Sequence, residues 1–493
     1  MDGFYVYFCE VHSCEISRRL KGEAMAKSNQ LHTFETSKYL FLTFLILTCF
    51  LLLASTAIAQ QSGIETGPGH DQAATPAAPA PTPAPAAAPA PKDFWHQQYL
   101  LGDWGGERTK LAEEKGVTFD FFYVADFLDT PQAAIHSGAG AWNRVRGTMD
   151  IDFGKLAGWK GLTFHVTGLW QGGPNIGADY LGSISNPSGL VSARTEILDS
   201  YWLQYAMADD KVEFRFGQFA SMDEYGLQPY GGSFLMEPID YGFGNRFNDY
   251  ASFDPASGPG VSLKVNPAKF MYFKAAYTSG NRNPYVQDPN GFHFVKHDSG
   301  VLSDEVGFNI GQPGTGVVKE KYYPGHYAFG STYNGGKFTN PFNPVPLFYS
   351  TYTGNYVIYV MGNQAVYRPK AGSNTGLDAF FGIAISPDEP YNFVDKNITT
   401  GFVYNGVIPS RPKDSVAFAL SYSHVSNSYS TAYADSFLGA PVLGSEKAFE
   451  VNYLFQATPF FIIQPVVQWY AELGANPNNP TGVVLGFRTK VTF

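Results

Sequence analysis

The chain has 493 residues and a formal net charge of −10, with 15% charged residues, 16% aromatic residues and 52 glycines. An ordinary soluble domain is about a quarter charged, and an acidic chain without a basic stripe excludes nucleic acid as a partner. The hydrophobic fraction of 44% and the mean hydropathy of −0.15 exclude a bundle of transmembrane helices. Low charge with many aromatic residues fits a β-barrel wall, in which lipid-facing and water-facing side chains alternate.

Residues 1–24 are expected to be an upstream extension that the natural protein lacks. Lys21-Gly22-Glu23 can be encoded by purine-rich triplets that resemble a bacterial ribosome-binding site just ahead of Met25. The stretch is also long and partly acidic for the start of a signal peptide. We therefore predict that translation begins at Met25.

Residues 25–59 have the three parts of a secretory signal peptide. Lys27 and Lys38 precede an apolar run at 39–54, and the small residues Ala57 and Ala59 follow it. This arrangement predicts export and cleavage between Ala59 and Gln60. The alternative is a single transmembrane anchor, for which the apolar run is short.

Residues 60–92 form an Ala/Pro-rich spacer, with the densest proline between 73 and 91. Alternating proline and alanine favour polyproline II over a packed core, and the prolines exclude a coiled coil. All three cysteines, Cys9, Cys14 and Cys49, lie ahead of the spacer. The mature protein is therefore predicted to contain no thiol. From residue 93 onward we predict a porin-like barrel with a short N-terminal helix.

From residue 117 onward the sequence alternates with the period of two that is typical of β-strands. At 117–128 the odd positions are apolar and the even positions include Thr118, Asp120 and Asp126. The same alternation is found at 144–153, 162–171, 449–456, 461–469 and 483–493. Carboxylates and guanidinium groups on one face need water, whereas the other face is uninterruptedly apolar. Strands in lipid must have both edges paired, so we predict a closed antiparallel up-and-down barrel.

The connections between these segments differ in length. Short turns are predicted at 158–161, 209–210 and 458–459, whereas long Gly/Asn/Pro-rich connections are predicted at 172–192, 221–258, 279–322 and 423–447. Outer-membrane barrels have short periplasmic turns and long extracellular loops. We expect one or more of the long loops to fold into the pore.

The last strand ends on an aromatic residue. Val483, Leu485, Phe487, Val491 and Phe493 share one face of this strand. An amphipathic strand that ends on an aromatic residue is what the outer-membrane barrel assembly machinery recognises. We therefore expect Phe493 to be part of the assembly signal.

Several segments together resemble the carbohydrate-selective porins of the OprB type. They are LLGDWGGERT at 100–109, DFGKLAGW at 152–159, YWLQ at 201–204, FRFGQF at 214–219, GVIPSRPKD at 406–414, QPVVQ at 464–468 and VLGFR at 484–488. The resemblance spans about residues 94–493, and it implies sixteen strands in the outer membrane of a Gram-negative bacterium. It also implies passive diffusion of mono- and small oligosaccharides. Ile197 stands where the family usually has an arginine ahead of the YWLQ segment.

A sugar that sheds water in a narrow pore needs many weak replacement hydrogen bonds, which charged side chains supply. The candidates for lining the pore or contacting sugar are Asp120, Arg144, Arg146, Asp150, Asp152, Arg194, Glu213, Arg215 and Arg246. Any of them could instead only wet the lumen and pair with its neighbours. Trp142 and Trp202 are candidates for stacking on a sugar ring, although a place in the aromatic girdle at the membrane interface is the favoured interpretation.

Catalytic and metal-binding readings find little support in the sequence. There is no Gly-x-Ser-x-Gly elbow and no phosphate-binding loop. His293 and His297 have a spacing that suits a metal only on a helix, but they lie in a Gly/Asp/Asn-rich stretch. We therefore expect neither enzymatic activity nor a cofactor.

Two other functions stay open beside sugar transport. One is a general or anion-preferring porin, and the other is an outer-membrane barrel enzyme or adhesin. The expected surroundings are outer-membrane lipid, lipopolysaccharide and the assembly machinery. The sequence leaves open whether the barrel is a monomer or a homotrimer.

Overall fold

A computed structural model describes residues 93–240, 247–248, 252, 255, 257–280, 290–292, 294, 299–311, 323–342, 351–370 and 373–493. The predicted upstream extension, signal peptide and spacer lie outside these residues. So do Arg246, His293 and His297.

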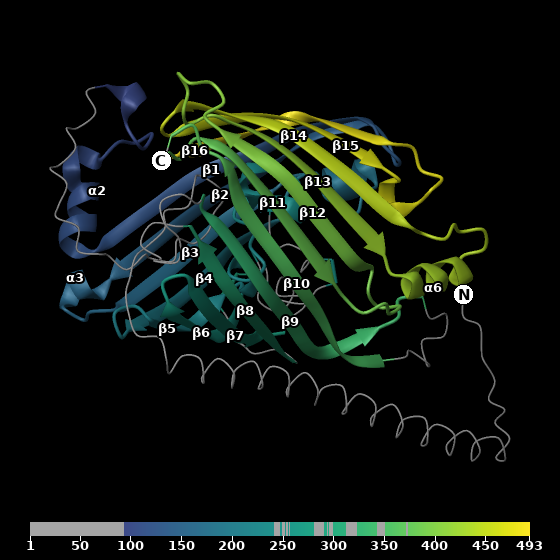
Figure 1. Cartoon of the computed structure of the whole chain (residues 1–493), viewed down its shortest axis with the longest axis horizontal. Coiled ribbons are helices and arrows are strands. Elements are labelled where there is room, and N and C mark those ends of the chain that lie inside the picture. The colour runs from purple at the N-terminus through teal and green to yellow at the C-terminus, as the bar shows by residue number, and fades with distance from the viewer. Residues whose placement is uncertain are drawn as a thin grey trace, which may run out of the picture. The chain divides into compact units, whose positions relative to one another are not determined.

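Sixteen antiparallel strands form a closed barrel in which each strand pairs with its neighbours in sequence and β16 pairs with β1 (Figure 1). The predicted fold is therefore confirmed. The strands are β1 (Val117–Gln132), β2 (Gly138–Asp152), β3 (Leu162–Gly172), β4 (Thr195–Met207), β5 (Val212–Phe219), β6 (Gly258–Ala268), β7 (Met271–Ser279), β8 (Gly300–Ile310), β9 (Gly325–Thr339), β10 (Thr351–Tyr367), β11 (Gly376–Ile385), β12 (Val394–Asn405), β13 (Ser415–Val425), β14 (Ser445–Thr458), β15 (Phe461–Ala471) and β16 (Gly482–Thr492).

The helices are short and lie at the strand ends and in the loops. Ahead of β1 come α2 (Glu107–Lys110) and a π-helical turn (Leu111–Lys115), and the other α-helices among the described residues are α3 (Phe153–Ala157), α4 (Glu237–Asp240) and α6 (Asn427–Ser436). The hydroxyl of Ser426 caps α6 by accepting a hydrogen bond from the Tyr429 N–H. No helix in the described ranges has both the length and the apolar character needed to cross a membrane.

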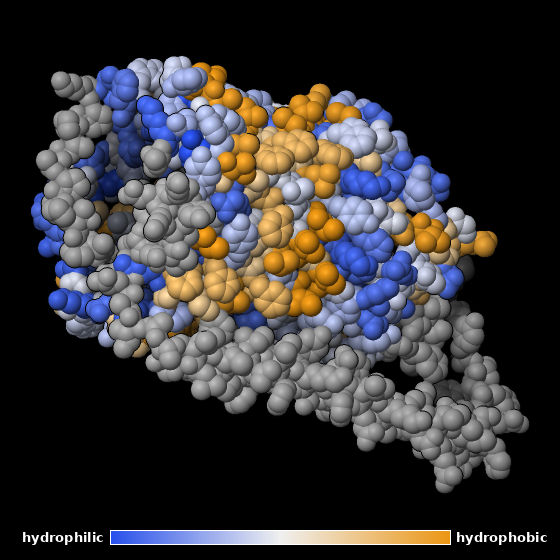
Figure 2. Space-filling view, in the orientation of Figure 1, coloured by the Kyte–Doolittle hydropathy of each residue, from blue (hydrophilic) through white to orange (hydrophobic). Residues whose placement is uncertain are grey.

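The predicted alternation sorts side chains between lipid and lumen. On β1, Phe121 and Phe127 are exposed on the outer face, whereas Asp126 on the inner face is 1% exposed. Figure 2 shows the result as orange residues across the middle of the visible wall and blue residues toward both ends. Such an apolar band flanked by polar ends is what a hydrocarbon layer requires.

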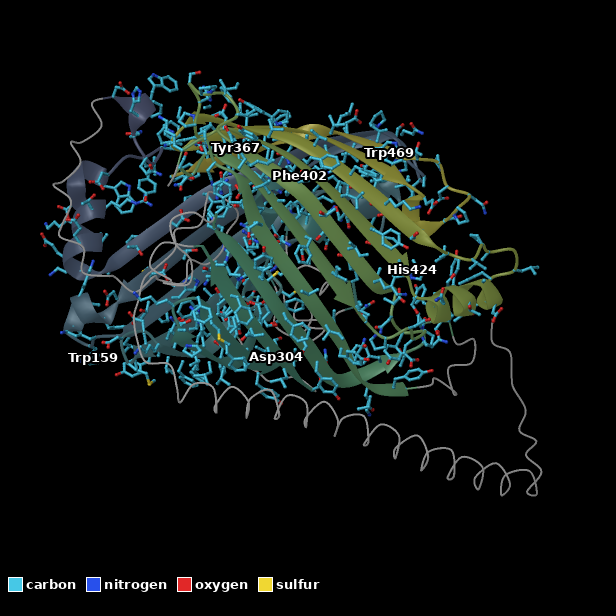
Figure 3. All side chains as sticks on the ribbon, viewed as in Figure 1. Trp159, Asp304, Tyr367, Phe402, His424 and Trp469 are labelled. Atoms are coloured by element: carbon cyan, nitrogen blue, oxygen red, sulfur yellow. The ribbon has the colours of Figure 1, made fainter. Side chains whose placement is uncertain are left out.

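The two ends of the barrel differ as expected. The β2–β3 connection with Trp159 marks one end, and α6 with the nearby His424 marks the other (Figure 3). The short turns at 158–161, 208–211 and 459–460 lie at the first end, with the start of β1 and the end of β16. One predicted connection was wrong, since 279–322 contains β8. The sequence analysis missed this strand because its alternating residues at 300–310 lie among glycines and asparagines. Because outer-membrane barrels have short periplasmic turns, the end that carries the short turns is the periplasmic end.

A single carboxylate lies on the outer face near the middle of a described strand. Asp304 of β8 alternates with the inward Glu305, and it accepts hydrogen bonds of 2.7 and 3.1 Å from the Ser331 hydroxyl on β9. Its outward neighbours Phe308 and Phe329 are 36% and 47% exposed. The Asp304 carboxylate thus lies on the lipid-facing surface, where an acidic group has a free-energy cost.

We expect Asp304→Ala to stabilise the barrel in lipid by about 1 kcal/mol, because it removes this desolvated carboxylate. The measurement is reversible urea unfolding in liposomes, with Asp129→Ala as the control, since Asp129 faces outward near the extracellular end of β1. Destabilisation by Asp304→Ala would contradict the expectation, and it would indicate that Asp304 has a partner on the outer surface.

Candidate functional site

Two long loops fold into the barrel, as predicted. In the β3–β4 loop (173–194) Leu181 and Leu190 are 0% and 1% exposed. In the β5–β6 loop (220–257) Phe234, Leu235 and Met236 are each 0% exposed. All of these side chains except Leu190, which belongs to a separate cluster, pack on apolar inward residues of the wall, which include Leu128, Phe380, Val466, Tyr470 and Val484. The two loops therefore narrow the lumen from the side of β11–β16 and β1.

Two glutamates on β14 hold the loops by their backbone. Glu450 accepts hydrogen bonds from the N–H groups of Leu235 (2.9 Å) and Met236 (2.8 Å). Glu446 accepts from the N–H groups of Ile184 (2.8 Å) and Ser185 (2.7 Å). Both glutamates are 0% exposed. A carboxylate that binds two adjacent amides fixes a loop in both position and orientation.

A buried ion pair lies beneath the same loops. The Arg488 guanidinium donates to both oxygens of Asp126 at 2.7 and 2.8 Å. Asp126 also accepts from the Ser188 hydroxyl (2.5 Å), and Arg488 donates to the Phe234 carbonyl (3.3 Å). The pair thus joins the β1–β16 wall to one residue of each infolded loop.

The opposite wall binds the start of the β5–β6 loop. Glu305 on β8 accepts from Lys274 (2.9 Å), from the hydroxyls of Tyr272 and Tyr359 (2.7 Å each), and from the Gly226 N–H (3.0 Å). Lys274 also donates to the Glu224 carbonyl. The loop is therefore held from both sides of the lumen.

A stack of four side chains crosses the inner faces of β2 to β5. Asp150 lies 2.7 Å from the His165 Nδ1, and the His165 ring stacks on Trp202 with centroids 4.5 Å apart. The Arg215 guanidinium lies 3.9 Å from the Trp202 ring centroid and forms an ion pair with Glu224 of the β5–β6 loop. Trp202 therefore supports a cation that also binds the loop.

The structure places the predicted aromatic candidates differently from the favoured girdle interpretation. Trp142 and Trp202 are both 3% exposed and face inward, so neither belongs to the girdle. Trp142 packs with Phe122, Val124 and Leu190, under the β3–β4 loop. Alternation alone puts both tryptophans on the inner face of their strands, and this signal outweighs the general preference of tryptophan for interfaces.

The predicted charged residues fall into two groups. Most are bound to the wall or the loops: Arg144 donates to Gln171 and the Leu190 carbonyl, Asp152 caps α3, Glu213 pairs with Lys264, Arg194 donates to the Gly173 carbonyl, and Arg215 belongs to the stack. Arg146 is 2% exposed. Asp120 is exposed, and the Asp150 side chain is 25% exposed. These two carboxylates therefore present oxygens to the lumen.

Sequence reasoning missed the residues that hold the loops. Glu450 was predicted only as a polar position on the strand at 449–456, whereas Glu305 and Glu446 lay within the predicted connections 279–322 and 423–447. The available signal was the apolar run Phe234-Leu235-Met236 inside a Gly/Pro-rich loop. Three consecutive large apolar residues in a connection predict burial, and buried backbone amides need acceptors.

Across the described ranges, no group of three or more His, Cys, Asp or Glu side chains could hold a metal ion.

Asp388, an acidic residue outside the strands, holds α6 against the β11–β12 loop at the extracellular end. Asp388, in the β11–β12 loop, accepts from the Ser428 N–H (2.8 Å) and the Ser426 hydroxyl (2.7 Å) at the start of α6. Burial alone would raise the pKa of Asp388, but these hydrogen bonds outweigh it and lower the pKa below its usual value. The stabilisation is present above the unfolded-state pKa of about 3.9, and it is lost as the pH falls through the lower folded-state pKa.

We therefore expect α6 to stay protected from protease at pH 5 and above, and to become increasingly susceptible as the pH falls below about 4 and through the lowered folded-state pKa of Asp388. Asp388→Ala should make α6 susceptible at neutral pH as well. Limited proteolysis across a pH series measures both effects. Equal protection of α6 in the variant and the parent at pH 7 would contradict the assignment.

The comparisons with known proteins agree on one family. The profile of the carbohydrate-selective porin, OprB family matches residues 136–493. The chain belongs to this family. This porin is 24% identical to Porin B of Pseudomonas aeruginosa over 434 residues, which cover 81% of the chain and 92% of that protein. It is 22% identical to the putative porin QuiX of Acinetobacter baylyi, over 81% of the chain and 95% of that protein.

A solved structure shares the fold of this porin. The high-pH structure of Pseudomonas putida OprB superposes with a TM-score of 0.74 at 20% identity, and the match covers 82% of this chain and all of that one. Family and barrel together make the protein an outer-membrane porin for carbohydrates in a Gram-negative bacterium, a channel rather than an enzyme.

Proposed function

We propose that mono- and small oligosaccharides diffuse passively through the lumen and exchange their water for hydrogen bonds with charged side chains of both signs. Asp120 and Asp150 present carboxylate oxygens, and Lys264 of β6, which is 34% exposed, presents an ammonium group. The observation that supports this proposal most directly is the exposure of the Asp120 side chain on the inner face of β1. Several weak bonds let a sugar enter and still leave.

The test is single-channel recording in planar bilayers with glucose or maltose added. We expect each sugar to reduce the current in a saturable way, and liposome swelling to fall steeply with sugar size. An unchanged current at saturating sugar would exclude a sugar-binding lumen.

We expect Asp120→Asn to weaken block by sugar about threefold to tenfold, because a charge-assisted hydrogen bond to a hydroxyl becomes a neutral one. The ion current without sugar should change little. Asp129→Asn is the matched control, since Asp129 lies on the same strand with its side chain on the outer face. The sugar-contact role of Asp120 fails if the two variants bind sugar equally well.

An anion-preferring channel is the second candidate, because Arg144 and Arg146 on β2 and Arg215 on β5 all face inward. The reversal potential in a salt gradient separates the two candidates. A strong anion preference without sugar block would favour this second function.

The precursor proposal follows the sequence. Residues 1–24 would be absent, residues 25–59 would be removed as a signal peptide, and residues 60–92 would remain as a spacer ahead of the barrel at 93–493. Amino-terminal sequencing of the protein from outer membranes should begin at Gln60. Recovery of peptides from residues 1–24 would contradict the proposed start.

The remaining proposals concern partners. We expect the assembly machinery to recognise β16 with Phe493. We expect lipopolysaccharide and lipid to surround the wall. We also expect the protein to catalyse no reaction. Native mass spectrometry in detergent distinguishes a monomer from a homotrimer. Phe493→Ala should reduce the amount of assembled barrel in the outer membrane while leaving the refolded channel conducting.

A further inference from the structure

The β1–β16 seam differs from every other strand pair in the barrel. The other neighbours are consecutive in sequence, whereas β1 and β16 lie at the two ends of the barrel sequence. Bringing such distant segments together has the largest loop-closure cost, and no short turn holds the pair in place if it opens.

The seam is also incomplete at its periplasmic end. β1 begins at Val117, but its first partner on β16 is the pair Phe122–Thr492. On the opposite side, β2 pairs with β1 from Val117 onward. The first five residues of β1 thus extend past the end of β16, and no strand pairs with them on that side. An open edge at a membrane interface leaves carbonyl groups that need donors.

Arg108 of α2 supplies those donors. Its Nη2 donates to the Phe119 carbonyl (2.5 Å) and its Nη1 donates to the main-chain oxygen of Phe493 (2.7 Å). The Phe493 N–H donates in turn to the Phe121 carbonyl (2.7 Å). The guanidinium therefore continues the hydrogen-bond ladder of the seam beyond the end of β16, with one of its nitrogens bound to each side.

The segment around Arg108 is built to hold it there. The Arg108 guanidinium carbon lies 3.3 Å from the Tyr99 ring centroid, and Arg108 is 7% exposed. Asp103 accepts from the N–H and the hydroxyl of Thr109 (2.9 Å each), which closes the turn ahead of α2. Gly105 and Gly106 have φ values of 72° and 100°, in the left-handed region that favours glycine. This accounts for the LLGDWGGERT segment at 100–109, which the channel function leaves unexplained.

A second contact ties the segment to β16 itself. The Leu100 N–H donates to the Thr492 carbonyl (2.8 Å), and the Phe94 ring packs on Phe460 in the β14–β15 turn. Figure 1 shows α2 and the end of β16 at the same end of the barrel. The segment thus reaches across β1, β16 and the neighbouring turn.

We propose that residues 99–109 form a clasp that binds the end of β16 and closes the periplasmic end of the seam, with Arg108 as the residue that locks it. The clasp acts after β1 and β16 have paired, because its two acceptors come from opposite sides of the seam. It keeps the finished barrel from reopening along this one join.

The test is hydrogen exchange of the refolded barrel in liposomes, read for the peptides of β1 and β16 and, as an internal reference, of β8 and β9. We expect Arg108→Gln to accelerate exchange at the seam about tenfold or more, because two charge-assisted hydrogen bonds are lost. Exchange in β8 and β9 should not change. Arg108→Lys should give an intermediate effect, since an ammonium group cannot reproduce the planar fork.

The matched controls are Glu107→Gln and Lys110→Gln, which flank Arg108 on α2 with side chains 63% and 55% exposed. They should leave exchange at the seam at the parent rate. Unchanged seam exchange in Arg108→Gln, or equal acceleration in β8 and β9, overturns the clasp. Should Arg108→Gln fail to refold, Tyr99→Ala decides, because it removes the ring under the guanidinium and should accelerate exchange at the seam alone.

Discussion

Replacing Glu450 with alanine is expected to widen the channel. The substitution removes the acceptor of the Leu235 and Met236 N–H groups and a partner of the Asn452 and Gln468 amides. Each buried amide left without an acceptor costs about 1–3 kcal/mol, so the β5–β6 loop gains more by leaving the wall and reaching water than by staying. Single-channel conductance should rise severalfold, and liposomes should admit sugars that the parent excludes.

The barrel itself should persist in Glu450→Ala, because the β14 ladder does not depend on this side chain. Glu450→Gln keeps one carbonyl acceptor and should give a smaller increase. Glu472→Gln is the matched control, since the Glu472 side chain is 42% exposed and pairs with Lys447 near the same end of β14. Parent conductance in Glu450→Ala would show that apolar packing of Phe234 and its neighbours holds the loop without the carboxylate.

The strand arrangement was predictable because lipid outside the barrel and water inside it require apolar and polar residues to alternate along each strand. Asp126 and Phe127, adjacent in sequence, differ as sharply in exposure as alternation requires. The inward loops could be predicted only as a possibility, since loop length says nothing about direction. The partner of a loop lies hundreds of residues away, as Glu450 does from Leu235, and no local pattern encodes that distance.

The same distance explains why the predicted site residues changed role. Arg144 and Arg215 were candidates for contact with sugar, because a charged side chain on the lumen face of a barrel normally meets water. In the folded chain a loop covers each of them, and their donors bind the Leu190 carbonyl and the Glu224 carboxylate. The charges that determine the shape of the lumen are thus largely covered by the loops, whereas Asp120 stays exposed to the lumen.

The Asp126–Arg488 pair gives the second large expected effect. Asp126→Ala should lower the free energy of unfolding by about 3–5 kcal/mol, because it leaves the Arg488 guanidinium buried at 3% exposure without its carboxylate. The Ser188 hydroxyl and the Phe234 carbonyl share this pair, so both infolded loops should lose order together. Urea unfolding in liposomes, followed by tryptophan fluorescence, measures the loss.

A paired substitution separates charge burial from shape. Replacing both residues, as Asp126→Leu with Arg488→Met, removes the two charges at once and should recover most of the stability, because apolar residues of similar size often replace a buried ion pair at little cost. The double variant should nevertheless conduct more than the parent, since neither new side chain can bind Ser188 or the Phe234 carbonyl. If instead the double variant is as unstable as Asp126→Ala, the contribution of this site lies in its hydrogen bonds to the loops rather than in the compensation of a buried charge.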